Sequence, residues 1–259
     1  MNEGIGGSAF AVINLHLPVA VLLFVRIFAT FSACLLFNKS RMPGLLRAGL
    51  SLLLAALLDS SGYFGLTDIN FSSLYYIGLV IKEAVVGYLL GVLLSVPFWL
   101  IESCGKVIDQ QRGEQFAAML NPLTSNTSSS VGRLLFQAFI GYFVAVNGIL
   151  AYLSIIFKSF LLIKLGEFLP VNPLSGYQLY VQMFSAYCYS FMLLTLPILI
   201  LTILTDLVLG LIGSFIPQLN ITVLSIPIKS VMVTAILIFM ISDIYHDVFA
   251  KVFILSQKF

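Results

Sequence analysis

The stretch YCYSFMLLTLPILILTILTDLVLGLIGSFI, residues Tyr187–Ile216, decides the fold class of this chain. Asp206 is its only charged residue. A bilayer core of ~30 Å is crossed by about 20 helical residues, so the stretch is long enough to span it. Lipid offers the backbone no hydrogen-bond partners, and the stretch lacks the alternation of a barrel strand. It therefore predicts a transmembrane helix.

Further apolar runs lie on both sides of this one, and the whole chain is 60% apolar and only 9% charged. Soluble domains are about 45–50% apolar and about 25% charged. We therefore predict an all-α, polytopic membrane-type protein, built of helical hairpins as a single domain over residues 1–259. The other long runs, each with at most two charges, are Leu15–Phe37, Leu74–Ile101, Val131–Ile163 and Val223–Ile241, and a shorter run, Pro43–Leu58, is a sixth span or one arm of a half-buried hairpin.

Charge and motif content exclude several classes of function. The formal net charge is +2, so there is no basic field that would hold nucleic acid. The two histidines, His16 and His246, are not in metal-ligand spacing, and no catalytic motif is present, which predicts neither a cofactor nor an enzyme. The cysteines Cys34, Cys104 and Cys188 show no CxxC spacing and are expected to be buried small hydrophobes.

The orientation of the spans does not follow simply from the basic residues. Lysines and arginines mark cytoplasmic loops, which places the segments 39–47 and 106–133 in the cytoplasm. Six simple spans that start outside would then leave Lys158 and Lys164 outside, against the same rule. Either the spans are miscounted, or some of the helices do not cross a bilayer in the ordinary way.

Ionisable residues inside apolar helices are costly and usually face partners or a water-filled path. A hairpin folded at Pro217-Gln218 would place Asp206 and Lys229 at similar depth, about 11 residues from the turn or ~16 Å at 1.5 Å per residue. We predict that these two side chains face each other. The alternative is that each meets a different helix or a neighbouring subunit. The residues of this kind are Arg26, Lys82, Glu83, Asp206, Lys229 and Asp243.

The segment Glu102–Met119 combines charges with small residues. Glu102, Lys106, Asp109 and Arg112 recur at three- and four-residue steps, which predicts one helical stripe with pairing of opposite signs. Gly105 between them is suited to tight packing against another helix, and Gly87-x-x-x-Gly91 forms a similar small-residue face. The alternative for the segment is a solvated loop helix.

The segment Ser95–Pro122, SVPFWLIESCGKVIDQQRGEQFAAMLNP, resembles the most characteristic stretch of the type III secretion export-apparatus T subunit, whose flagellar counterpart is the R-type biosynthesis protein. The family's Ile-Asp-x-Gln-Arg-Gly core stands here as Ile108–Gly113, and Pro122 follows at family-like spacing. Pro217-Gln218-Leu219-Asn220, followed by Lys229, is similar to the turn before the family's last apolar helix. Asn121 departs from the pattern, because an Asp commonly precedes the proline, and this puts any role for charge there in doubt.

The resemblance implies a core component of an export gate in the bacterial inner membrane. In such a gate one T subunit joins several R-type and S-type subunits around a conduit. Unfolded secreted proteins pass through it after delivery by the large export-gate protein. The helices of the family pack largely on sister subunits, which would explain the failed orientation count. The Ser-Val-Pro-Phe-Trp stretch leans towards an injectisome rather than a flagellum.

The resemblance also implies roles for particular residues. Asp109, Gln111, Arg112, Gly113 and Pro122 are expected in the constriction of the gate or in its supporting network. Pro217, Asn220 and Lys229 are expected in the hairpin or at a subunit contact, together with Asp206, which the hairpin geometry pairs with Lys229. Two other functions remain open, a small-solute transporter and a structural membrane scaffold without a conduit. A transporter would predict inverted repeats, and neither half of the chain reproduces the pattern of the other.

Overall fold

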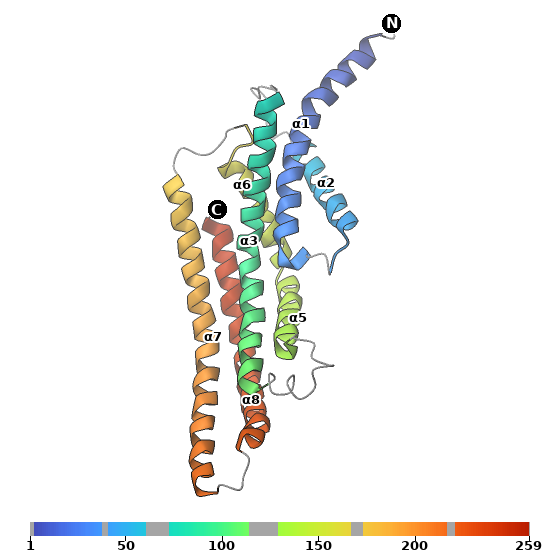
Figure 1. Cartoon of the computed structure of the whole chain (residues 1–259). Coiled ribbons are helices and arrows are strands. Elements are labelled where there is room, and N and C mark those ends of the chain that lie inside the picture. Colours follow the sequence, from blue (N-terminus) through green and yellow to red (C-terminus); the bar gives the residue numbers. More distant parts are fainter. Residues whose placement is uncertain are drawn as a thin grey trace. The chain divides into compact units, whose positions relative to one another are not determined.

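The computed structural model describes residues 3–37, 41–60, 73–113, 129–166, 173–216 and 221–258. Within these ranges every regular element is a helix, which confirms the predicted all-α fold (Figure 1). The helices are α1 (Glu3–Ala33), the short 3-10 helix η1 (Leu35–Phe37), α2 (Gly44–Ser60), α3 (Ser73–Arg112), α5 (Ser130–Ala145), α6 (Gly148–Leu162), α7 (Pro173–Phe215) and α8 (Ile221–Lys258).

Several of these helices are long and apolar enough to cross a membrane. In the described residues they are Leu74–Arg112 of α3, Phe184–Phe215 of α7 and Val223–Met240 of α8, and α5 with α6 makes a fourth span if the bent pair is one crossing. The apolar part of α1, Leu17–Ala33, is shorter. The chain is therefore a multi-pass helical membrane protein.

The apolar run Val131–Ile163, predicted as one helix, is broken into α5 and α6. The break lies at Val146 and Asn147, and Asn147 has a φ of 58°, in the left-handed region that asparagine tolerates better than most residues. The ring of Phe143 packs against Gly148, where a side chain would not fit. The segment Glu102–Met119, predicted as a helical stripe, begins as the last turns of α3, which ends at Arg112.

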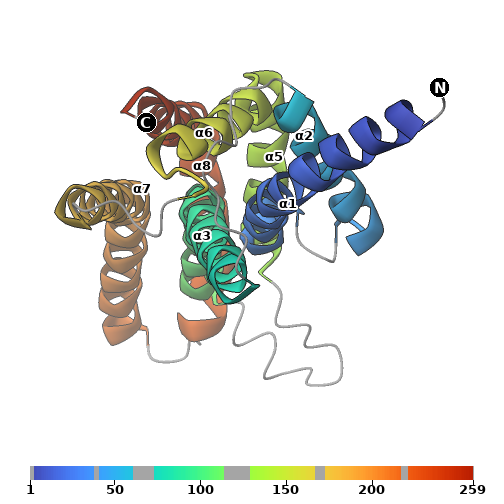
Figure 2. The same ribbon diagram turned by 90° about the horizontal axis from the view of Figure 1, so that it is seen from above.

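The helices group into two compact units, each with its own core. Unit 1 comprises Met1–Val96, Leu150–Gly176 and Lys258–Phe259. In unit 1, α1 lies beside both α2 and the first part of α3 (Figures 1 and 2). Its core includes Leu22, Leu23, Ile27 and Leu79, and its aromatic contacts join Phe31, Phe37 and Tyr152, with ring centroids 4.7–6.2 Å apart.

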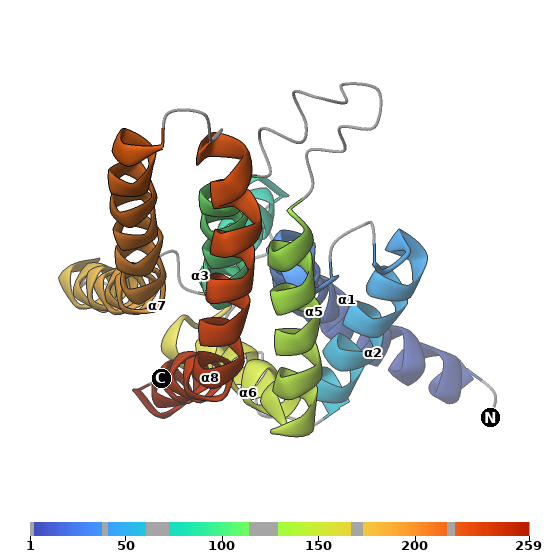
Figure 3. The same ribbon diagram turned by 90° about the horizontal axis from the view of Figure 1, so that it is seen from below.

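Unit 2 comprises Pro97–Ile149 and Tyr177–Gln257. Here α7 and α8 run antiparallel, and α8 lies beside α5 and the end of α3 (Figure 3). Phe98 of α3 packs against the buried phenylalanines Phe136, Phe139 and Phe143 of α5, with ring centroids 5.3–6.2 Å apart. Tyr245 of α8 donates a hydrogen bond to the carbonyl of Leu135.

Candidate functional site

The motif residue Asp109 lies near the end of α3 and caps the start of α5 in unit 2. Its Oδ2 accepts hydrogen bonds from Ser129 Oγ at 2.6 Å and from the Val131 amide at 2.8 Å. Ser129 is the N-cap of α5, and its Oγ accepts from the Gly132 amide at 2.8 Å. Two amides that lack helical partners are thus satisfied. Asp109 is only 4% exposed, so a buried carboxylate faces the positive end of the α5 dipole.

Arg112 connects this cap to α8. Its Nη1 lies 3.5 Å from Asp109 Oδ1, and its Nη2 donates to the hydroxyl of Ser230. The opposite-charge pairing predicted along the stripe is confirmed here and in the Glu102–Lys106 pair, at 2.8 Å. Asp109 and Arg112 therefore join the end of α3 to the start of α5 and to Ser230 of α8. We call this group, with Ser129 and Ser230, the junction network.

Glycines allow α3 and α5 to come close enough for the contacts of the junction network. A Cβ added to Gly105 of α3 would overlap the backbone of Gly132 in α5, so the helices touch backbone to backbone. The tight packing predicted for Gly105 is confirmed. Gly113 follows α3 with a φ of 88°, which favours glycine, and its amide donates to the Gln110 carbonyl at 3.1 Å.

Of the other residues predicted for the constriction, the structure describes Gln111, which makes none of the contacts of the junction network. Gln111 lies at the same end of α3 and is partly exposed. Pro122 lies outside the described residues. The predicted participation of the whole group in a constriction stays a prediction.

The predicted pair of Asp206 and Lys229 is present in unit 2. Lys229 Nζ lies 2.6 Å from Asp206 Oδ1 and 2.7 Å from Oδ2, across the α7–α8 hairpin. The Asp206 side chain is 51% exposed and that of Lys229 12%. The predicted pairing is therefore confirmed. The predicted contact of these residues with another subunit stays a prediction. Pro217 and Asn220 lie outside the described residues.

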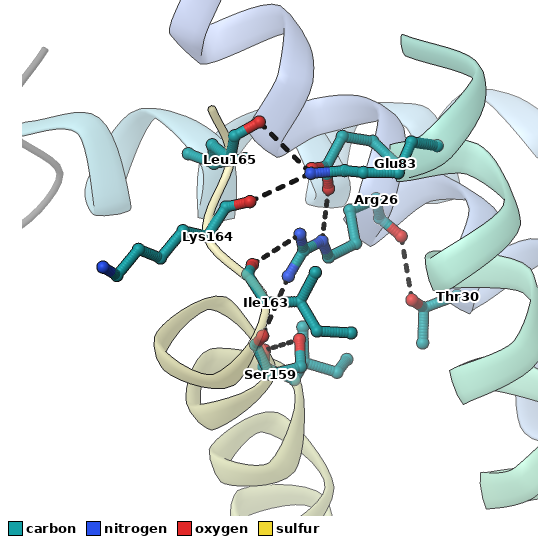
Figure 4. A network of polar contacts seen from close by, with 9 residues as sticks. Arg26, Thr30, Glu83, Ser159, Ile163, Lys164 and Leu165 are labelled. Carbon is teal, nitrogen blue, oxygen red and sulfur yellow. Dashed lines mark hydrogen bonds and ion pairs between the residues drawn. The ribbon is translucent and has the colours of Figure 1, made fainter. Parts of the chain in front are cut away.

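A second polar cluster lies inside unit 1 (Figure 4). Glu83 of α3 accepts a charged hydrogen bond from Arg26 Nε of α1, and Lys82 Nζ lies 2.6 Å from Glu83 Oε1. Arg26 and Glu83 are 0% exposed, and Lys82 is 7% exposed. The Arg26 guanidinium also stacks on Phe160, 4.3 Å from the ring centroid. One buried carboxylate thus stands between two cations.

The remaining donors of this cluster bind the end of α6 and residues 163–166 (Figure 4). Carbonyl groups at the end of a helix carry partial negative charge, and where water is absent they need hydrogen-bond donors from the protein. They therefore offset the positive charge that the single carboxylate of Glu83 does not neutralise. We call residues 163–166 the strap. The contacts are Arg26 to Ser159 O (3.0 Å) and Ile163 O (2.9 Å), Lys82 to Lys164 O (2.9 Å) and Leu165 O (3.2 Å), and Tyr75 Oη to Gly166 O (2.8 Å).

Sequence reasoning identified Arg26, Lys82 and Glu83 as costly but did not pair them. The sequence feature that could have indicated the pairing is that charges of opposite sign lie on two different apolar runs. The glycine face at Gly87 and Gly91 fixes how α3 is positioned along α1, because a Cβ on either glycine would overlap the α1 backbone at Arg26 or Thr30. The small-residue face therefore packs α3 on α1 within this chain.

The cysteines separate into two classes. Cys34 and Cys104 are buried as predicted, whereas Cys188 on α7 is exposed, so its predicted burial is wrong. Within the described ranges, no group of three or more His, Cys, Asp or Glu residues has metal-binding geometry.

Thiol reactivity is expected to reveal this division. In the purified chain in mild detergent, N-ethylmaleimide should modify Cys188 rapidly, and Cys34 and Cys104 only after denaturation, because burial excludes the reagent. Intact-mass spectrometry would count the adducts, and Cys188→Ser serves as the control that abolishes the rapid one. Rapid modification of the Cys188→Ser variant would contradict the burial of the other two.

The fold and its internal ion pairs define a multi-pass membrane protein with polar junctions between helices. Comparison with known proteins gives its family. A family model described as "Bacterial export proteins, family 1" matches residues 17–254, and the chain belongs to that family.

Curated relatives include both translocation and flagellar proteins. The chain is 34% identical to the Yop proteins translocation protein T of Yersinia pestis over 160 residues, which is 62% of this chain and 61% of that relative. It is 27% identical to the surface presentation of antigens protein SpaR of Shigella flexneri over 256 residues, covering 97% and 96%. It is 26% identical to the flagellar biosynthetic protein FliR of Bacillus subtilis over 244 residues, 92% of each chain.

Proposed function

We propose that the chain is a core subunit of a type III secretion export gate in the bacterial inner membrane. Together with R-type and S-type subunits it would line a conduit for unfolded secreted proteins, which the large export-gate protein delivers. Membership of the bacterial export family supports this function over a small-solute transporter. The observation that supports a role for particular residues is the junction network. Its residues Asp109 and Arg112 both come from the family-like motif Ile108–Gly113.

The junction network suggests how these residues act. Asp109 and Gly113 fix the residues on either side of the segment 114–128. Gly113 directly follows α3, and Asp109 caps the start of α5. We propose that Asp109, Gln111, Arg112, Gly113 and Pro122 form the supporting framework of the constriction. Asp109 and Arg112 would act by holding α3, α5 and α8 together rather than by touching cargo.

Replacing Arg112 tests this function. Arg112→Ala should abolish secretion or make the membrane leak to small ions, because α8 loses its bond to α3 and Asp109 loses its counter-charge. Secreted protein in the medium and membrane potential in the same cells are the measurements. Arg133→Ala is the matched control, because Arg133 lies on α5 in the same unit with an exposed side chain. Normal secretion through a sealed membrane in Arg112→Ala would contradict the proposal.

A further inference from the structure

The first turn of α2 holds a buried cation with few partners. Arg47 is only 5% exposed, and its Nε is buried without a hydrogen-bond partner. Its Nη1 lies 3.5 Å from the Phe37 carbonyl, a long distance for a hydrogen bond, and its Cζ lies 5.6 Å from the centroid of the Phe28 ring. None of the ion pairs between described residues includes Arg47. A buried cation without a counter-ion is costly, so this position favours a bound anion.

Arg47 reaches back to the start of the helix on which it lies. Its Nη2 is 4.0 Å from the position that a Cβ on Gly44, the first residue of α2, would take. The adjacent residues and helix backbone aside, no other atom lies within 4 Å of that position. The first turn of α2 contains no acidic residue. Amides at the start of a helix lack helical partners and carry partial positive charge, so they bind phosphate groups. We call the amides of residues 44–46 and the guanidinium of Arg47 the α2 start site.

The α2 start site is open on its outer side. Residues 43–46 are all exposed, and the glycine at position 44 leaves the first amides without a covering side chain. The amide of Arg47 itself is occupied, because it donates to the Pro43 carbonyl at 3.2 Å. A ligand with several charged acceptor oxygens, such as a phosphate group, matches the remaining amides and the guanidinium.

The position of the site indicates which phosphate reaches it. The site adjoins η1, where the apolar run Leu15–Phe37 ends, and the end of such a run lies at the level of the lipid headgroups. Residues 38–41 add two cations in sequence, and basic residues at this level attract anionic lipids. A stripe of exposed leucines continues from the site along one face of α2, because its members recur at three- and four-residue steps. Acyl chains can cover this leucine stripe, and a free phosphate ion cannot. The members of the stripe are Leu46, Leu50, Leu53 and Leu57.

We propose that the α2 start site binds the phosphate group of an anionic phospholipid. The amides of residues 44–46 donate to the phosphate oxygens, Arg47 neutralises the phosphate charge from the buried side of the site, and the acyl chains lie along the leucine stripe. The site belongs to unit 1 and shares no residue with the junction network. The inference therefore goes beyond the proposed function and does not depend on it.

Binding of defined lipids to the purified chain in mild detergent tests the inference. Native mass spectrometry during a titration gives the affinity for phosphatidylglycerol, with phosphatidylcholine, whose choline cancels the phosphate charge, as the comparison. Phosphatidylglycerol should bind about tenfold more tightly, and Arg47→Leu should remove this preference, because the guanidinium supplies a charge-assisted hydrogen bond. An apolar side chain suits the buried position, and protection of Cys34 from maleimide checks that unit 1 remains folded. An unchanged preference in the folded variant would overturn the proposal.

Two glycine substitutions separate the α2 start site from surface charge in general. Gly44→Asp places a carboxylate at the positive end of α2 and beside Arg47. It should lower the affinity for phosphatidylglycerol about tenfold and raise the resistance of unit 1 to denaturant, because the chain then supplies its own anion. Gly49→Asp is the matched control, since Gly49 is exposed on the same helix and no atom lies within 4 Å of the position of its Cβ. It adds the same charge beyond the first turn and should change the affinity less than about twofold. Equal losses of affinity in both variants would reject a specific site at the start of α2.

Competition with inorganic phosphate distinguishes a lipid headgroup from a free ion. Millimolar inorganic phosphate should leave phosphatidylglycerol bound, because the ion makes no contact with the leucine stripe. Displacement of the lipid would identify a free phosphate as the occupant and reject the phospholipid. None of these measurements uses secretion as a readout, so their outcome is independent of the outcome of Arg112→Ala.

Discussion

Glu83→Leu is expected to lower the free energy of unfolding by about 3–5 kcal/mol, because it removes the one carboxylate between two buried cations. Arg26 is 0% exposed and Lys82 is 7% exposed, so neither cation gains water in exchange. The measurement is denaturant unfolding of the purified chain, followed by maleimide modification of Cys34 in a Cys188→Ser background. Cys34 belongs to unit 1 and is buried, so it reports on the unit that contains Glu83.

Two comparisons make this result specific. Glu102→Leu removes a partly exposed acid from a helical ion pair and should cost less than about 1 kcal/mol. In an Arg26→Met background, Glu83→Leu should cost less than it does alone, because the two residues share one interaction. Equal costs in both backgrounds would show that Arg26 and Glu83 do not act as a pair.

Gly105→Ala is expected to destabilise the protein by about 1–3 kcal/mol and to reduce secretion strongly. The added methyl meets the backbone of Gly132, and a backbone cannot move aside as a flexible side chain can. Separation of α3 from α5 would also lengthen the hydrogen bonds from Ser129 and Val131 to Asp109. Circular dichroism during denaturation gives the stability, and secreted protein gives the function.

Gly141→Ala is the matched control for this substitution. Gly141 lies on α5, as Gly132 does, and no atom lies within 4 Å of the position of its Cβ. Alanine favours helix over glycine by about 1 kcal/mol, so this variant should be unchanged or slightly more stable. Equal losses in both variants would show that the close contact at Gly105 is not the cause.

Short connections made part of this structure predictable. Asp206 and Lys229 lie on helices that follow one another in the sequence with a short connection, so counting residues from this connection predicted their pairing. The charged stripe from Glu102 to Arg112 was predictable for the same reason, since helical spacing alone brings its members together. Local geometry decides both cases.

Contacts between distant segments were not predictable in this way. Arg26 and Glu83 are 57 residues apart, and no short connection fixes the register of α1 against α3. The cap that Asp109 provides for α5 also depends on how α3 meets a helix beyond residues 114–128. By contrast, the break at Asn147 had a local signal, since Asn-Gly is a turn dipeptide, but the high hydrophobicity of the run outweighed it.

The strap changes how the crossings of this chain are to be counted. Arg26, Lys82 and Tyr75 do for its carbonyls what solvent does at the end of an ordinary membrane helix. A helix that ends on such donors has no need to reach an aqueous phase before the chain turns. Lys158 lies within α6, so its charge says nothing about which side a loop occupies. The side of the membrane on which the carboxyl terminus lies therefore depends on how many helix ends reach water, a number that a count of apolar segments does not give.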